Sequence, residues 1–165
     1  MKKVVIYSDG SCYKNGHKDA VGGIGVYNET ECKYLQKKIV YSTFNMPVTN
    51  NICELYAIKV AIDIYARRDN ELLIISDSQY CVNVFTKWAK SWESNNWRKK
   101  DNKEILNLEL IKNIYENYKK LNISFKHVNS HTEEPKDKTS KEYKLWYGNF
   151  IADMLASNAM KLKDK

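Results

Sequence analysis

VVIYSDGSC, residues 4–12, decides the fold, because an apolar run there reaches a carboxylate that is followed at once by a glycine. Val4–Ser8 has the β-branched composition of a buried strand. A carboxylate beside such a strand is costly to bury unless it is paired or binds a metal. The alternative is that Asp9 and Gly10 open a turn, because Asp-Gly is a common turn dipeptide. This stretch alone leaves both interpretations open.

Hydrophobic periodicity predicts the other elements. Strands are predicted at 4–8, 22–27, 34–41, 72–76 and 123–128. Helical spacing of apolar residues is found at 50–67, 78–88, 103–119 and 148–161. A long mobile loop is expected at about 132–146, where a proline lies among many charges, and a short basic tail at about 161–165. The order of elements predicts an α/β fold, a mixed sheet flanked by helices, in a single domain over residues 1–165.

The composition is that of a globular protein with a basic excess. The formal net charge of +7 favours a polyanionic partner such as a nucleic acid. The four cysteines lack the spacing of zinc ligands, so free thiols are expected: Cys12, Cys32, Cys53 and Cys81. Neither a signal peptide nor an apolar run long enough to cross a bilayer is seen. We therefore expect an intracellular protein of the cytoplasm or nucleus.

Three further carboxylates occupy positions comparable to that of Asp9. The segment LLIISDSQY repeats the pattern at Asp77, Glu54 lies near the start of the first predicted helix, and Asp153 lies one turn into the last. Functional sites in α/β sheets collect at the carboxyl ends of strands, where these groups could converge. Four close carboxylates repel one another unless divalent cations neutralise them, as in a two-magnesium site. The alternative is four separate caps and turn residues.

Five motifs then follow one another along the chain: YSDGSCYKNG at 7–16, TNNICELYA at 49–57, SDSQY at 76–80, HVNSH at 127–131 and GNFIADMLA at 148–156. Together they resemble type 1 ribonuclease H, the endonuclease that cuts the RNA of RNA–DNA hybrids, over nearly the whole chain. The resemblance implies a mixed five-stranded sheet whose first three strands are antiparallel and whose last two are parallel. It implies a single catalytic domain without a separate hybrid-binding module, and no obligate protein partner.

The resemblance also implies a reaction. It is hydrolysis of the RNA strand with two Mg²⁺ ions, for which Mn²⁺ can substitute, leaving 5′-phosphate and 3′-hydroxyl ends. Asp9, Glu54, Asp77 and Asp153 would be the catalytic metal ligands, and His131 matches a mobile histidine that assists proton movement and product release. Two rival functions are a hybrid-binding protein without catalysis and a DNA-acting nuclease of the same fold.

Substrate contacts are implied as well. The RNA strand would be contacted by Ser11, Cys12, Asn15, Asn50 and Asn51, and the DNA strand by Thr49, Tyr80, Trp88, Trp92 and Asn107. A basic protrusion would consist of Arg98, Lys99, Lys100 and Lys103. Alternatives from spacing are that Asn50 caps a helix and that the tryptophans belong to the core.

Two features depart from the family pattern. Pro47 stands where the phosphate-binding pocket usually has an arginine, and proline offers neither a charge nor a side-chain donor. The segment between His131 and Asp153 is longer than in bacterial members, which leaves the position of His131 undetermined.

Overall fold

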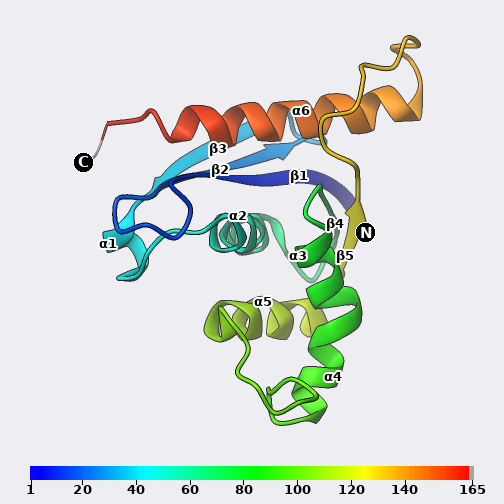
Figure 1. The fold of residues 1–165 in the computed structure, drawn as a ribbon. Helices are drawn as coiled ribbons and strands as arrows, with labels where there is room; N and C mark the ends of the chain where they lie inside the picture. Colours follow the sequence, from blue (N-terminus) through cyan, green and yellow to red (C-terminus); the bar gives the residue numbers. More distant parts are fainter. Residues whose placement is uncertain (164–165) are drawn as a thin grey trace.

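The computed structural model describes residues 1–163, which form one five-stranded sheet with helices on both faces (Figure 1). The strand order is β3-β2-β1-β4-β5. The three strands at one side are antiparallel, and β4 and β5 run parallel to β1. This confirms the predicted sheet. The strands are β1 (Lys2–Tyr13), β2 (Val21–Asn28), β3 (Lys33–Ile39), β4 (Asn70–Ser76) and β5 (Ile123–His127).

Strand β1 is central and longer than predicted. Its parallel pairing with β4 ends at Ser8, opposite Ser76, whereas its antiparallel pairing with β2 continues to Tyr13. Asp9 therefore lies within a strand, and the interpretation of Asp9 and Gly10 as the opening of a turn is wrong. The change of partners explains why a carboxylate follows the apolar run. Strand β1 has a neighbouring strand on both sides up to Ser8 and on one side only beyond it.

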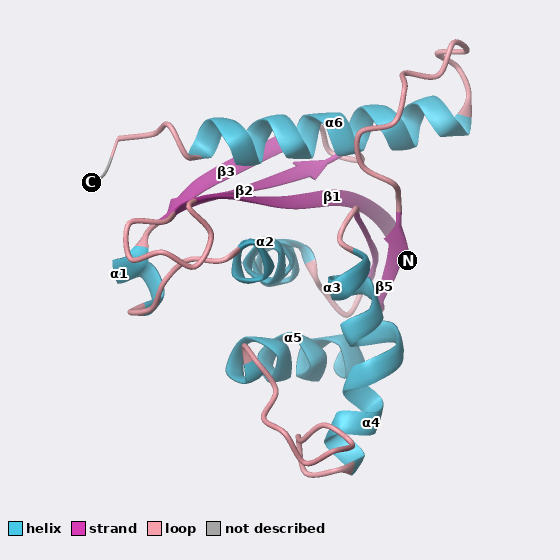
Figure 2. Cartoon of the chain, viewed as in Figure 1, coloured by secondary structure: helices cyan, strands magenta, loops and turns pink. Residues whose placement is uncertain are grey.

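The helices lie on the two faces of the sheet (Figure 2). Helix α6 covers one face, while α2 lies against the other, with α5 beneath α2. The segment from α3 to α4 is almost continuous, interrupted by a short π-helix, and it extends away from the sheet. The helices are α1 (Tyr41–Phe44), α2 (Asn50–Tyr65), α3 (Gln79–Asn83), the π-helix η1 (Val84–Trp88), α4 (Ala89–Ser94), α5 (Leu108–Lys120) and α6 (Lys141–Ala159).

Both faces of the sheet are buried. Alternate side chains of β1 point to opposite faces, so Val4 and Ile6 join the core with α2 and α5, while Tyr7 joins the core with α6. On the α6 side, a Cβ atom at Gly25 would lie only 2.3 Å from the carbonyl oxygen of Ala152. Glycine on β2 therefore allows α6 to lie directly on the sheet.

Several predicted boundaries need correction. Helix α6 begins at Lys141, after Ser140 caps it by accepting from the Tyr143 N–H, so residues 141–146 of the predicted loop are helical. Helix α5 begins at Leu108 rather than near 103, because Asn107 has a φ of 61° in the left-handed region. Residues 164–165 of the predicted tail lie outside the described residues. The four cysteines are free thiols, as expected. No helix in the described part has the length and apolarity to span a membrane.

Candidate active site

Three carboxylates meet at the carboxyl end of the parallel strands. Asp9 comes from β1, Glu54 from α2, and Asp77 directly follows β4. One carboxylate oxygen from each lies within 4.8 Å of the other two. The two aspartates meet because Ser8 pairs with Ser76 and each serine is followed by its aspartate. The three carboxylates therefore form one cluster, and for them the alternative of separate caps and turn residues is wrong.

Helix α2 reaches β1 because Gly10 has no side chain. A Cβ atom there would lie 2.4 Å from both the Cys53 carbonyl carbon and the Glu54 nitrogen, closer than side chains come to backbone. The Gly10 N–H donates to Glu54 Oε1 at 2.6 Å and to Asp9 Oδ1 at 3.0 Å. Gly10 thus allows the helix to approach and orients two of the three carboxylates.

Burial and repulsion perturb this cluster. The exposed fractions of Asp9 and Glu54 are 4% and 9%. Burial, followed by the charge of Glu54, raises the pKa of Asp9 far above its ordinary value, and burial also raises the pKa of Glu54. The charges of Asp77 and Asp153 act in the same direction on both groups. The metal-free cluster therefore binds a proton more strongly than isolated carboxylates do.

These residues fit a divalent cation. Within the described chain, Glu54 Oε2 is buried and has no hydrogen-bond partner. A buried polar atom of this kind calls for an explanation, and an ion is one of the few that suit an anionic oxygen. Carboxylate oxygens are the ligands that Mg²⁺ and related hard cations prefer. A bound cation would satisfy this oxygen and neutralise the repulsion at the same time.

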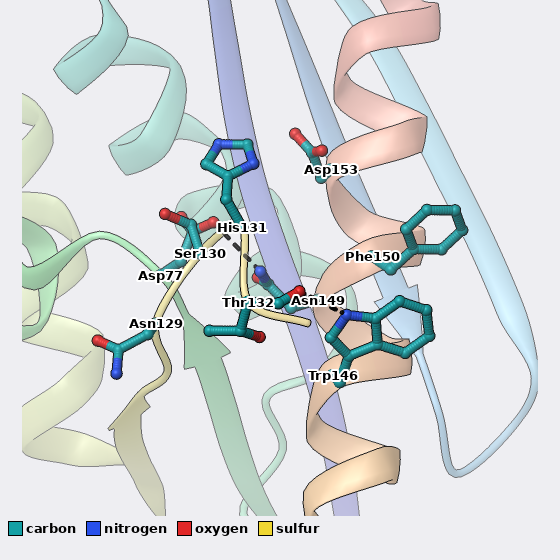
Figure 3. Close-up of a pocket in the computed structure, with 9 residues that line it drawn as sticks. All are labelled: Asp77, Asn129, Ser130, His131, Thr132, Trp146, Asn149, Phe150 and Asp153. Atoms are coloured by element: carbon teal, nitrogen blue, oxygen red, sulfur yellow. Dashed lines mark hydrogen bonds between the residues drawn. The ribbon is translucent and has the colours of Figure 1, made fainter. Parts of the chain in front are cut away.

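Helix α6 provides the opposite wall of the site (Figure 3). Asp153 is not one of the three clustered carboxylates, but it lines the same pocket of about 300 Å³ as Asp77. Asp153 lies more than three turns into α6 rather than one, because that helix begins earlier than predicted. One turn before it, the buried Asn149 donates from Nδ2 to Asp77 Oδ2 at 3.3 Å. This hydrogen bond connects α6 to the carboxylate that follows β4.

His131 lies on the loop between β5 and α6 and lines this pocket with Asp77 and Asp153. Its side chain is exposed, and its backbone φ of 54° is in the left-handed region. The lengthened segment before Asp153 therefore leaves the histidine beside the carboxylates. The role of His131 in the reaction stays a prediction.

The residues expected to contact RNA lie around the start of α2 and the end of β1. The Asn15 side-chain oxygen accepts from the Asn50 N–H at 2.7 Å, and Cys12 Sγ lies 3.5 Å from the Val48 carbonyl oxygen. Ser11 lies in β1 beside these groups, and Asn51 is exposed in the first turn of α2. The prediction that Asn50 caps α2 is wrong.

The cap of α2 is Thr49, whose Oγ1 accepts from the Ile52 N–H at 3.1 Å. The hydroxyl expected at a DNA phosphate is thus already bonded to the helix. Asn107 instead lies near Tyr80, where it opposes the rise that burial causes in the pKa of the phenol. Pro47 precedes Thr49 by two residues, on an exposed surface.

Aromatic and charged side chains from η1, α4 and the loop after α4 form a second hollow. Trp88 contacts both Tyr80 and Trp92, with ring centroids 6.2 Å and 5.9 Å apart. A hollow of about 540 Å³ is lined by Trp88, Trp92, Lys99, Lys100 and Asp101. Trp88 is 38% exposed, whereas Trp92 is half-buried and also packs against the core. The predicted contact with the DNA strand therefore suits Trp88 better than Trp92.

The protrusion between α4 and α5 is held by its own backbone. The Asn95 side-chain amide donates to the carbonyl oxygens of Arg98 and Lys99, and the Lys99 N–H donates to the Lys103 carbonyl at 3.0 Å. Trp97 packs edge-on against Tyr115 and so attaches the protrusion to α5. The basic side chains therefore project from an ordered loop.

Comparison with known proteins assigns this architecture to a family. The sequence model of RNase H matches residues 1–161. The chain belongs to the RNase H family. It is 33% identical to the ribonuclease H of Clostridium botulinum, over 97% of each chain. It is 32% identical to the ribonuclease H of Schizosaccharomyces pombe, over 92% of this chain and 51% of the yeast protein. The ribonuclease H family depends on divalent metals, in agreement with the carboxylate cluster.

Solved structures share the fold of this ribonuclease H family member. The solution structure of the PFV RNase H domain has a TM-score of 0.71 and 24% identity, covering 96% of this chain and 94% of that domain. A foamy viral protease-reverse transcriptase in complex with RNA/DNA hybrid has a TM-score of 0.72 and 20% identity, over 95% of this chain and 20% of that protein. These likenesses concern the fold alone.

Two contributors to the site escaped sequence reasoning. Asn149 lies four residues before Asp153, so helical spacing puts both on one face, a signal that could have identified it. The Gly10 N–H had no sequence signal, because its partner Glu54 is distant along the chain. Both contacts orient carboxylates.

Proposed function

We propose that this chain is a ribonuclease H that hydrolyses the RNA strand of RNA–DNA hybrids with two Mg²⁺ ions, leaving 5′-phosphate and 3′-hydroxyl ends. The observation that carries the proposal is the cluster of Asp9, Glu54 and Asp77 within 4.8 Å, with a buried carboxylate oxygen that lacks a partner. Such a cluster is unfavourable for a protein that only binds an anionic duplex, because carboxylates repel phosphate. Metal-assisted hydrolysis requires it.

The four carboxylates would hold the ions, with Asp9, Glu54 and Asp77 in the cluster and Asp153 on the facing helix. When bound, the divalent ions lower the pKa of a water molecule and stabilise the leaving oxygen. Mn²⁺ would substitute, because it accepts the same oxygen ligands. Gly10 and Asn149 fix the carboxylates by hydrogen bonds, so that the ligands are positioned before the ions arrive. His131, at the pocket edge, would move a proton and assist product release.

Substrate discrimination would come from the two sides of the site. Ser11, Cys12, Asn15, Asn50 and Asn51 border the carboxylates at the start of α2 and would read the 2′-hydroxyl groups that distinguish RNA from DNA. On the other side, the Trp88 hollow would hold the DNA strand by stacking, and the protrusion by charge. Tyr80, Trp92 and Asn107 would complete that surface, with Thr49 at its edge.

A cleavage assay tests the proposal against both rivals. Labelled RNA–DNA, RNA–RNA and DNA–DNA duplexes are incubated with the protein in Mg²⁺ or in EDTA. We expect cleavage only of the RNA in the hybrid, only with Mg²⁺, with 5′-phosphate ends. Cleavage of DNA–DNA would favour the DNA-acting nuclease, and binding of the hybrid without cleavage would favour the non-catalytic protein.

The Asp77→Asn variant tests the metal site. It removes one charged ligand at nearly constant size, so cleavage should fall by orders of magnitude while hybrid binding survives. Exposed Asp19, changed to Asn, provides the matched control and should cleave normally. Equal activity of the two variants would refute the assignment of the ligands.

A further inference from the structure

The loop that carries His131 is held to α6 by one side chain. Trp146 donates from its indole Nε1 to the carbonyl oxygen of Thr132 at 3.1 Å (Figure 3). Thr132 directly follows His131, whose φ of 54° costs energy for a residue with a side chain. A strained conformation persists only where surrounding contacts hold it. The bond from Trp146 holds the carbonyl group of the residue that follows the strained one.

The indole is itself fixed. Its ring stacks on Phe150, with ring centroids 5.3 Å apart and an interplanar angle of 14°. It also contacts the ring of Tyr143, with centroids 5.6 Å apart. These three residues are spaced by three and four along α6, so their rings are adjacent on the helix. An N–H on an immobilised ring is a better tether than one on a mobile chain, because little rotamer entropy is lost when it bonds.

The same stretch of α6 also positions the carboxylates. Asn149 and Asp153 follow Trp146 at three and seven residues, which puts all three on one side of the helix. Asn149 contacts Asp77, Asp153 lines the pocket, and Trp146 lines it while bonding to the loop. Helix α6 therefore contacts both the loop and the carboxylates.

We propose that Trp146 is a positioning residue that holds His131 beside the carboxylates. The inference rests on the proposed function for the role of His131, but the tether itself does not. Without it, residues 129–136 would have no hydrogen bond to α6 within the described chain, and His131 would sample more positions. The net value of one neutral hydrogen bond corresponds to a change of about two- to twelvefold in the ratio of held to free loop.

The decisive variant is Trp146→Phe, which keeps an aromatic ring beside Phe150 but removes the N–H donor together with the five-membered ring that carries it. We expect kcat for hybrid cleavage to fall about two- to twelvefold with KM nearly unchanged. Tyr143→Phe is the matched control, because it removes a polar hydrogen from the neighbouring ring and leaves the tether in place. Wild-type kcat in Trp146→Phe, or an equal loss in Tyr143→Phe, would overturn the proposal.

A double-variant cycle shows whether Trp146 acts through His131. In a His131→Ala background, Trp146→Phe should cause no further loss of kcat, because the group that it positions is gone. Losses that multiply would mean that the indole acts on substrate by another route, and would overturn the positioning role.

Backbone NMR relaxation gives a readout that needs no catalysis. In Trp146→Phe, the order parameters of residues 130–134 should fall below those of the wild-type protein, while those of α6 and those of the same loop in Tyr143→Phe stay unchanged. Unchanged order parameters in the loop would overturn the tether. If the wild-type protein did not cleave hybrids but the loop responded as expected, the proposed function would fail and the tether would stand.

Discussion

Asp77→Asn should make the metal-free protein more stable. At an effective dielectric constant of about 20, two unit charges 4.8 Å apart, the limit for this cluster, repel by about 3 kcal/mol. Asp9 and Glu54 retain a proton more strongly than usual, so Asp77 faces roughly one net charge rather than two. Asp77 is partly exposed, and solvent screens part of the repulsion. We expect a gain of about 1–3 kcal/mol, or about 3–9 °C in Tm for a chain of this size.

The gain should grow with pH. A carboxyl group whose pKa is raised on folding makes the folded state bind more protons than the unfolded state. Its contribution is fully present below the unfolded pKa and is lost as pH rises through the folded pKa. Burial raises the pKa of Asp9 and of Glu54, so the metal-free wild-type protein should lose stability as pH rises from about 4 to above 7. Removing the Asp77 charge should flatten this decline.

Thermal unfolding at pH 5 and pH 8, measured once in EDTA and once in excess Mg²⁺ without EDTA, tests these effects. The wild-type protein should gain stability with Mg²⁺ according to mass action, and Asp77→Asn should gain much less. Asp19→Asn, which changes an exposed carboxylate, should behave like the wild type. A loss of stability in metal-free Asp77→Asn at pH 8 would refute the view that the cluster stores repulsion.

Three other substitutions test separate parts of the molecule. Gly10→Ala should cost about 1–3 kcal/mol of stability and abolish cleavage, because its Cβ would push α2 from β1; normal unfolding and cleavage would contradict the close approach. Trp88→Ala should weaken hybrid binding by about 1–3 kcal/mol while its unfolding free energy falls by only about 1 kcal/mol, and the reverse pattern would make Trp88 a core residue. Changing Lys99, Lys100 and Lys103 to glutamine should raise KM, spare kcat and reduce the salt slope of binding by up to roughly 0.9 per lost phosphate contact; an unchanged slope with a lower kcat would place the protrusion in the active site.

The sequence sufficed for the sheet and for two of the three clustered carboxylates, Asp9 and Asp77, because both depend on strong local signals. The apolar run at 72–76 and the alternating apolar and polar residues at 123–128 are both typical of strands, and they appear as β4 and β5 with nearly those bounds. An aspartate at the end of each of two parallel strands must lie near the other when the strands are in register. Glu54 needed the family resemblance, because its position on α2 sets no distance to β1.

The errors have physical causes as well. Asp9 looked like a turn residue because Asp-Gly is common in turns, but pairing with β2 continued the strand, and long-range pairing has no local signature. The start of α6 was placed at Gly148 because the polar residues before it lack an apolar stripe. In the structure, Ser140 caps a helix that begins at Lys141, and the aromatic side chains of Tyr143 and Trp146 pack along its first turns. Aromatic packing between turns thus replaced the apolar periodicity on which the prediction depended.

The site combines groups of graded rigidity, and the gradation matches what each group is proposed to do. Asp9 lies on a strand paired on one side, Asp77 is hydrogen-bonded to Asn149, and Glu54 is held by Gly10, so the candidate ligands have little freedom. A metal site needs this, because ligands must be in place to within about half an ångström. Among the described residues, in contrast, the loop at 129–136 that carries His131 has one hydrogen bond to the rest of the protein, from Trp146 to Thr132. A group that carries a proton in and releases product must move, and one hydrogen bond of modest net value can break and reform on each cycle. The tether therefore confines the histidine without fixing it, which neither a helix nor a strand at that position would allow.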